Sequence, residues 1–161
     1  MPGHSTKQEQ QSKMAMSGIE VDPSVVSLFN DMKIRHSHKF AVFRIEKKKT
    51  IVLDFAADAD ETTDREGDKK RFQEASALLK TAEPRYVLYD FRFTTKEGRL
   101  MNKLAFIFWC PEDSKVGDKM LYAASKDAIK KSFTGLSSEF QANDRGDFDY
   151  TTYADEVEKK N

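Results

Sequence analysis

An uninterrupted apolar run, LAFIFW from Leu104 to Trp109, sets the strongest condition on the fold of this chain. A half-buried strand alternates apolar and polar side chains, whereas this run is apolar at every position, so both of its faces must be covered. The run is far too short to span a bilayer. We therefore expect residues 103–110 to form a central strand of a sheet that is covered on both sides.

Other segments of the chain predict the elements that surround this strand. Short β-branched and aromatic runs predict three more strands, at residues 39–45, 50–56 and 85–93, and the charged EKKK between the first two predicts a hairpin. Asp22-Pro23 is a favourable helix start, and apolar residues continue at helical spacing for about three turns. Similar spacing predicts helices near residues 68–81, from 114–117 to 133, and near 152–160. Strands interleaved with helices predict an α/β fold, a mixed sheet sandwiched between helices.

The length of 161 residues suits one domain with a substantial core and is too short for two. Residues 1–15 are polar and aperiodic, and we interpret them as a disordered extension. Met16-Ser17-Gly18 looks like a natural start, which favours a remnant of protein expression over a native tail. Residues 16–161 then form the folded domain.

Charge and cysteine content exclude several classes of protein. The 27 basic residues cancel the 27 acidic residues, so overall charge favours neither nucleic acid nor a membrane surface. The single cysteine, Cys110, excludes an internal disulfide and a cysteine-based zinc site. No apolar run is long enough for a transmembrane segment, and the start lacks a charged-then-apolar leader. We expect a soluble, monomeric intracellular protein that does not bind nucleic acid.

Signals for catalysis or metal binding are weak. His36 and His38 lie in a polar connector without a cysteine or an acidic cluster nearby, which makes a poor metal site. Cys110 has no identifiable base beside it, so a packed thiol is a better interpretation than a nucleophile. Gly98 and Gly117 are isolated and form no phosphate loop. We expect no enzymatic activity, no metal and no cofactor.

The segment DKMLYAASKDAIKK, residues 118–131, predicts a helix with an unusual outer face. At about 100° per residue, its large apolar side chains, such as Tyr122 and Ile129, gather on the side that faces the sheet. Met120 falls on the opposite side, among alanines, Asp127 and lysines. Single exposed apolar residues are common and often have no function. A flexible methionine ringed by lysines would also suit docking into a partner's cleft with an acidic rim.

The longer segment DKMLYAASKDAIKKSFTG is similar to the signature helix of the ADF/cofilin family of actin-filament depolymerising and severing proteins. FIFWCPED, YVLYDFRF and SGIEVDPSVVSLFNDMK also resemble that family, in the same order along the chain, over about residues 16–160. The resemblance implies a single ADF-homology domain with a five- or six-stranded mixed sheet. It also implies a protein of the cytoplasm and actin cytoskeleton that binds monomeric and filamentous actin without catalysis.

Site residues follow from the same resemblance. Lys119 and Met120 match the residues with which the family's long helix enters the cleft between two actin subdomains. The complete set implied for the monomer-type site is Ser17, Gly18, Ile19, Lys115, Lys119, Met120, Ala123 and Asp127. The set implied for the filament-type site is Arg99, Lys103, Asp155 and Lys159.

Three positions depart from the family pattern. Gly117 stands where another basic residue is usual, which bears on the affinity for monomeric actin. Met101 and Glu156 stand where basic residues are typical of some members. These departures suggest a weakened filament contact, while a solvated strand edge and helix face remain the alternative interpretation of the filament-type charges.

Regulation of the family suggests two more expectations. Phosphorylation of the serine that matches Ser17 blocks actin binding in many members, because it would place about two negative charges where an acidic actin surface approaches. Phosphoinositide headgroups inhibit family members, and the candidates here are Lys115, Lys119, Lys126, Lys130 and Lys131. Two functions therefore stay open: disassembly of filaments with a preference for ADP-actin, or a domain of the same fold that sequesters monomers or binds phosphoinositides with weak or no severing.

Overall fold

The computed structural model describes residues 18–160, so residues 1–15 and Ser17 lie outside the described part of the chain. A six-stranded sheet runs through the described residues in the order β1-β3-β2-β4-β5-β6. Its strands are β1 (Glu20–Val21), β2 (His38–Glu46), β3 (Thr50–Asp58), β4 (Arg85–Thr94), β5 (Leu100–Trp109) and β6 (Ser138–Ala142). The helices are α2 (Pro23–Arg35), α3 (Arg65–Leu78), α4 (Val116–Ser132) and α5 (Tyr150–Lys159).

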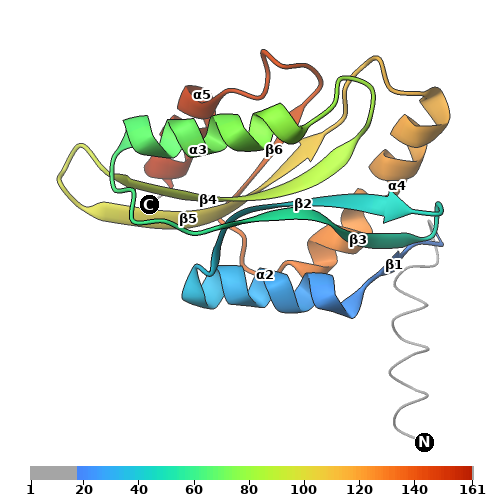
Figure 1. Ribbon diagram of the computed structural model, residues 1–161, viewed down its shortest axis with the longest axis horizontal. Helices are drawn as coiled ribbons and strands as arrows, with labels where there is room; N and C mark the ends of the chain where they lie inside the picture. The colour runs from blue at the N-terminus through green and yellow to red at the C-terminus, as the bar shows by residue number, and fades with distance from the viewer. Residues whose placement is uncertain (1–17, 161) are drawn as a thin grey trace, which may run out of the picture.

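The sheet is mixed and has helices on both faces. Strands β3, β2, β4 and β5 are antiparallel neighbours, whereas β1 pairs parallel to β3 and β6 pairs parallel to β5. Helices α3 and α5 contribute to the core cluster on one face, and α2 and α4 contribute to the cluster on the other. Figure 1 shows α3 and α5 above the sheet and α2 below it. The predicted α/β sandwich is therefore confirmed.

Strand β5 is an interior strand covered on both faces, as its apolar run predicts, and it lies next to the edge strand β6. It pairs with β4 on one side and β6 on the other. Its side chains alternate between the two core clusters, because successive residues of a strand point to opposite faces. Ala105, Ile107 and Trp109 belong to the cluster beneath α3 and α5, and Leu104, Phe106 and Phe108 to the cluster beneath α2 and α4.

Capping residues explain where the first two described helices begin. The Asp22 carboxylate accepts a hydrogen bond from the Ser24 amide at 2.9 Å, with Pro23 in the first turn, as the sequence predicts for α2. The Asp64 carboxylate likewise accepts from the Gly67 amide at 2.7 Å and starts α3. Helix α3 therefore begins and ends about three residues earlier than the predicted range of 68–81.

Two strands were not predicted individually from the residues. Strand β1 has only two residues, which is too short to show a periodicity. Strand β6, with the sequence SEFQA, buries its small end residues Ser138 and Ala142 and lacks a strong apolar alternation. Both strands lie at the edges of the sheet, where the extended conformation depends mainly on pairing with the neighbouring strand.

Candidate functional site

The long helix α4 presents Met120 to solvent. The Met120 side chain is 68% exposed, whereas Tyr122, Ser125 and Ile129 are buried against the sheet. The orientation predicted from helical spacing is therefore confirmed. Ala123 and Asp127, on the same outer face, are also exposed.

Tyrosine contacts fix the rotation of α4 on the sheet. The Tyr86 hydroxyl donates to the Tyr122 carbonyl at 2.5 Å, and the Tyr122 hydroxyl accepts from the Ile45 amide at 2.9 Å. Burial raises the pKa of both phenols, so they stay neutral. Further along the helix, the ring of Phe133 stacks on Phe29 with centroids 4.6 Å apart. Rotating Met120 inward would break these contacts, so the outer face is set by the packing of the inner face.

Val116 extends the apolar part of this surface. Its side chain is 70% exposed and precedes Met120 by four residues, so the two lie one turn apart on α4. Sequence reasoning missed Val116 because it lies in the first turn, where the predicted start of the helix was uncertain by several residues. The i, i+4 spacing from Met120 was the available signal. We call Val116, Met120, Ala123 and Asp127 the outer stripe of α4.

The five lysines predicted to bind phosphoinositides do not form one cluster of unpaired side chains. The Lys130 ammonium pairs with Glu139 at 2.7 Å, and the Lys126 ammonium lies over the ring of Phe108, 5.9 Å from its centroid. The other three lysines are spread along the helix: Lys115 at the N-cap position, Lys119 in the first turn and Lys131 in the last.

The N-terminal residues of the predicted monomer-type site lie beside α4. Gly18 is exposed and has a φ of 70°, a value that favours glycine. Strand β1 follows it and packs against α4. The Ile19 side chain is 0% exposed and belongs to the core beneath α2 and α4. The Ile19 side chain therefore secures this segment to the domain, and the place of Ile19 in the monomer-type site stays a prediction.

Three of the four residues implied for the filament-type site line one hollow of about 450 Å³. These are Arg99, Asp155 and Lys159; Lys103 is not among the lining residues. The hollow lies where the β4–β5 turn meets α3 and α5, and we call it the charged hollow. Its lining residues are Arg65, Thr95, Lys96, Glu97, Arg99, Asp155, Glu158 and Lys159. Figure 1 shows the β4–β5 turn at the opposite end of the molecule from the start of α4.

Arg65 and Lys96 are charged-hollow residues that sequence reasoning missed. The Arg65 guanidinium donates to Asp155 at 2.6 Å and to Glu158 at 3.0 Å. These hydrogen bonds outweigh the opposing effect of burial and raise the pKa of Arg65 above its ordinary value. Arg65 lies 90 residues before Asp155, ahead of the predicted helix at residues 68–81, so no local spacing linked the two. Lys96 precedes Arg99 by three residues, between the predicted strands at residues 85–93 and 103–110, and this proximity was a usable signal.

The departure at Met101 has a structural basis. Its side chain is 2% exposed and belongs to the core cluster beneath α3 and α5. Met101 is paired with Phe93 of β4. This position therefore contributes packing and presents no side chain to a partner.

His36 and His38 each lie within hydrogen-bonding distance of a neighbouring side chain, and Cys110 is partly buried. His36 Nδ1 lies 2.8 Å from the Asp90 carboxylate, and His38 Nδ1 lies 2.9 Å from the Ser37 hydroxyl. Burial raises the pKa of the Cys110 thiol, which disfavours a reactive thiolate. Over residues 18–160, no group of three or more His, Cys, Asp or Glu side chains is arranged to hold a metal ion. None of the helices in this part of the chain is long and apolar enough to cross a membrane.

Comparisons with known proteins agree with these observations. The family model of cofilin/tropomyosin-type actin-binding proteins matches residues 18–158. A cofilin of Gibberella zeae is 37% identical over 152 residues, covering 91% of this chain and 97% of the relative. Actin-depolymerizing factor 1 of Arabidopsis thaliana is 35% identical over 140 residues, covering 86% and 94%.

The fold matches solved structures as well. The crystal structure of Plasmodium berghei actin depolymerization factor 2 superposes with a TM-score of 0.77 at 30% identity, covering 88% of this chain and 97% of that one. The family consists of binding proteins rather than enzymes. With a family model that spans almost all of the described residues, this chain belongs to the ADF/cofilin family of actin-binding proteins.

Proposed function

We propose that this protein binds monomeric and filamentous actin, prefers ADP-bound subunits and promotes filament disassembly and severing at the actin cytoskeleton. Family membership and the 68% exposure of Met120 on a rigidly anchored helix are the observations that support it. Binding energy would drive the process, because a protein that binds one filament geometry more tightly shifts the filament toward that geometry.

The outer stripe of α4 suits insertion into a groove of a partner. Val116 and Met120 supply an apolar centre, and Lys115 and Lys119 supply positive charge at its edge. An apolar core with a charged rim is the usual anatomy of such an interface. Since α4 is held to the domain through Tyr86 and Phe29, the helix needs little ordering when it binds, which lowers the entropic cost.

A double substitution on α4 tests this surface. Lys119→Ala with Met120→Ala should abolish binding to monomeric actin and leave the melting temperature nearly unchanged, because Met120 is exposed and Lys119 is not part of the core. The measurement is affinity for fluorescent ADP-actin and ATP-actin monomers, with thermal unfolding in parallel.

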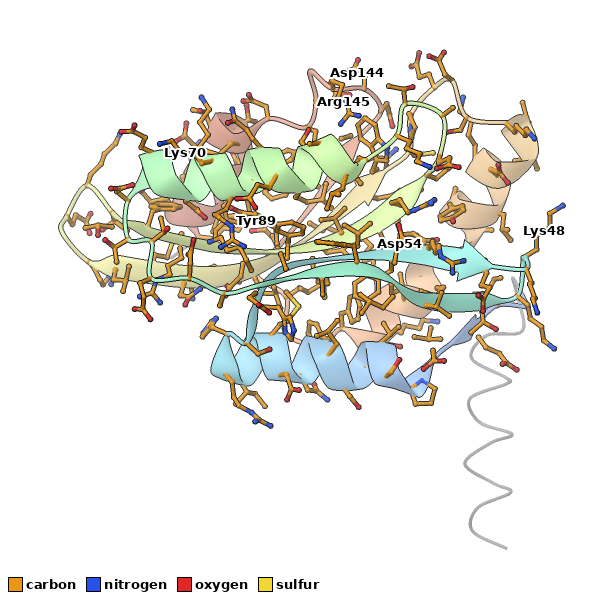
Figure 2. The ribbon with its side chains drawn as sticks, in the orientation of Figure 1. Lys48, Asp54, Lys70, Tyr89, Asp144 and Arg145 are labelled. Atoms are coloured by element: carbon orange, nitrogen blue, oxygen red, sulfur yellow. The ribbon has the colours of Figure 1, made fainter. Side chains whose placement is uncertain are left out.

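Lys70→Ala with Gln73→Ala is the matched control for this experiment. It also removes one lysine and one other exposed side chain from a helix surface, but on α3, across the sheet. Figure 2 shows Lys70 on the outer side of α3. Undiminished actin affinity of the α4 variant, or equal loss in the α3 control, would contradict the proposed docking surface.

The second candidate is a domain that sequesters monomers or binds phosphoinositides, with weak or no severing. The burial of Met101 favours it, because a basic residue typical of some members is replaced by a core residue. Filament co-sedimentation combined with a severing assay separates the two candidates. Tight monomer binding without any loss of filament length would select the second.

We also propose that phosphorylation of Ser17 regulates monomer binding. Ser17 lies outside the described residues, but its neighbour Gly18 is exposed close to the elements that pack against α4. Ser17→Asp should weaken monomer affinity, since negative charge would face an acidic actin surface. Ser17→Ala is the control, and equal affinities of the two variants would exclude this switch.

A further inference from the structure

The charged hollow contains acids that are paired inside the molecule. Arg65 donates to Asp155 and Glu158, which lie on adjacent turns of α5, at 2.6 and 3.0 Å. The guanidinium also lies over the ring of Phe93 in β4, 4.6 Å from the centroid. One guanidinium of α3 therefore pairs with two carboxylates of α5, which leaves one net negative charge on the three groups, and it also packs against the sheet at Phe93. Arg65 is 31% exposed, so this pairing is partly shielded from solvent.

Two basic side chains on the β4–β5 turn, which lines the same hollow, are unpaired within the described part of the chain. Among residues 18–160, neither the Lys96 nor the Arg99 side chain has a hydrogen-bond or ion-pair partner. The turn that carries them is nevertheless well defined: the Thr95 amide donates to the Arg99 carbonyl at 2.8 Å, and the Gly98 amide donates to the Thr95 carbonyl at 2.9 Å. Gly98 has a φ of 85°, which glycine adopts without strain. The hydrogen-bonded turn thus fixes the backbone from which both side chains reach the lining of the hollow.

The distribution of charge in the hollow indicates what it accepts. Two of its three lining acids, Asp155 and Glu158, already have a counter-ion in Arg65, which leaves Glu97 as the remaining carboxylate. Against it stand Lys96, Arg99 and Lys159, of which Lys159 makes an exposed pair with Glu156 at 3.3 Å. The lining thus has four basic and three acidic side chains, so the hollow as a whole carries one positive charge in excess and suits an acidic partner segment.

From this arrangement we infer that Arg65 is a positioning residue of the filament-type surface. It holds Asp155 and Glu158 in ion pairs within the domain, and Lys96 and Arg99 receive carboxylates of the filament. Asp155, implied as a partner contact by family resemblance, then acts only through Arg65. Without Arg65, the two freed carboxylates would attract Lys96 and Arg99 and repel an acidic partner. This inference rests on the proposed binding of actin filaments.

Filament co-sedimentation of the full chain with Arg65 variants tests the positioning role. Arg65→Met removes the charge but keeps an apolar stem over Phe93, and it should weaken filament binding about tenfold. Arg65→Lys keeps the charge and should restore most of the affinity. Monomer affinity, which depends on α4, should not change in either variant. A loss of monomer affinity in Arg65→Met as large as the loss of filament affinity would indicate general destabilisation and overturn the inference.

A triple variant separates internal pairing from direct contact. Arg65→Met with Asp155→Asn and Glu158→Gln removes the cation together with both of its acids. If the acids serve only Arg65, filament affinity should return to within about threefold of the unmodified protein, which is within about 0.7 kcal/mol by the affinity arithmetic. If Asp155 contacts the filament directly, the triple variant will bind no better than Arg65→Met, and the inference is wrong.

The proposed role of Lys96 and Arg99 is tested by how filament binding depends on salt concentration. Lys96→Gln with Arg99→Gln should weaken filament binding about tenfold and flatten its dependence on ionic strength, because screened charge pairs are lost. Lys69→Gln with Lys70→Gln, two exposed cations on α3, is the matched control and should leave both quantities unchanged.

The outcomes distinguish this inference from the proposed function. If the unmodified protein binds neither monomers nor filaments, the proposed function fails and the inference fails with it. If the unmodified protein binds filaments while the Arg65 or Lys96/Arg99 variants bind equally well, only the inference is overturned.

Discussion

Met101 and Leu100 are neighbours in β5 whose side chains meet different surroundings. Met101 is 2% exposed within the core, and Leu100 is 46% exposed. Met101→Lys should lower the free energy of unfolding by about 3 kcal/mol, because it removes apolar packing and buries an unpaired charge. Leu100→Lys, the control, should change it by about 0.5 kcal/mol or less. Urea unfolding measures both, and a tolerated lysine at position 101 would show that this side chain can reach solvent.

Single residues of the candidate site differ in how well local pattern predicted them. The outward direction of Met120 followed from helical periodicity, because neighbouring turns of one helix fix it. The burial of Ile19 did not follow, since it depends on α4 and β1 meeting in space. Contact of these residues with actin stays a prediction.

Contacts between elements add a titratable link between α2 and the sheet. His36, which ends α2, lies 2.8 Å from Asp90 of β4, and Asn102 of β5 donates to the other carboxylate oxygen at 2.7 Å. The hydrogen bond to Asp90 raises the pKa of His36 above its ordinary value of 6.5, while burial and the charge of Arg92 oppose the shift. Protonated His36 is thus favoured in the folded state.

The sign of the resulting pH dependence follows from linkage. Because the folded pKa exceeds the unfolded pKa, the stabilisation by His36 is fully present below about pH 6.5 and is lost as the pH rises through the raised pKa. Between pH 6 and pH 8, the free energy of unfolding should therefore fall more in the unmodified protein than in His36→Gln. His38→Gln is the control, because the His38 ring nitrogen lies 2.9 Å from the Ser37 hydroxyl and is not paired with a carboxylate in the described part of the chain. Parallel pH profiles for the unmodified protein and His36→Gln would contradict this account.

Across the molecule, a buried polar network joins segments that are distant in sequence. The Asp68 carboxylate is 0% exposed, pairs with Lys39 of β2 at 2.5 Å and accepts hydroxyl hydrogen bonds from Tyr89 at 2.9 Å and Tyr150 at 2.7 Å. Figure 2 shows Tyr89 between the sheet and α3. The network therefore links β2, β4, α3 and α5 on the face of the sheet that also carries the charged hollow.

Removing Asp68 should destabilise the whole domain. Asp68→Ala leaves the Lys39 ammonium buried without its counter-ion, and we expect a loss of about 3–5 kcal/mol in the free energy of unfolding. Lys39→Met combined with Asp68→Leu should cost less than Asp68→Ala, because no buried charge remains. Chemical denaturation compares the three proteins. A double variant less stable than Asp68→Ala would show that the network contributes more than charge compensation.

The sequence alone was sufficient for the α/β class, most element positions, the interior, doubly covered place of β5 and the outer face of α4. Each of these depends on local periodicity, capping or an apolar run, and such signals are complete within a short segment. The pairing of Arg65 with α5, the burial of Asp68 and the core position of Met101 needed the folded chain. These features join residues that sheet pairing and helix packing bring together from distant parts of the chain. The ion-pair partner of a charged residue is therefore set by tertiary contacts. The same contacts decide which charged side chains remain free to bind another protein.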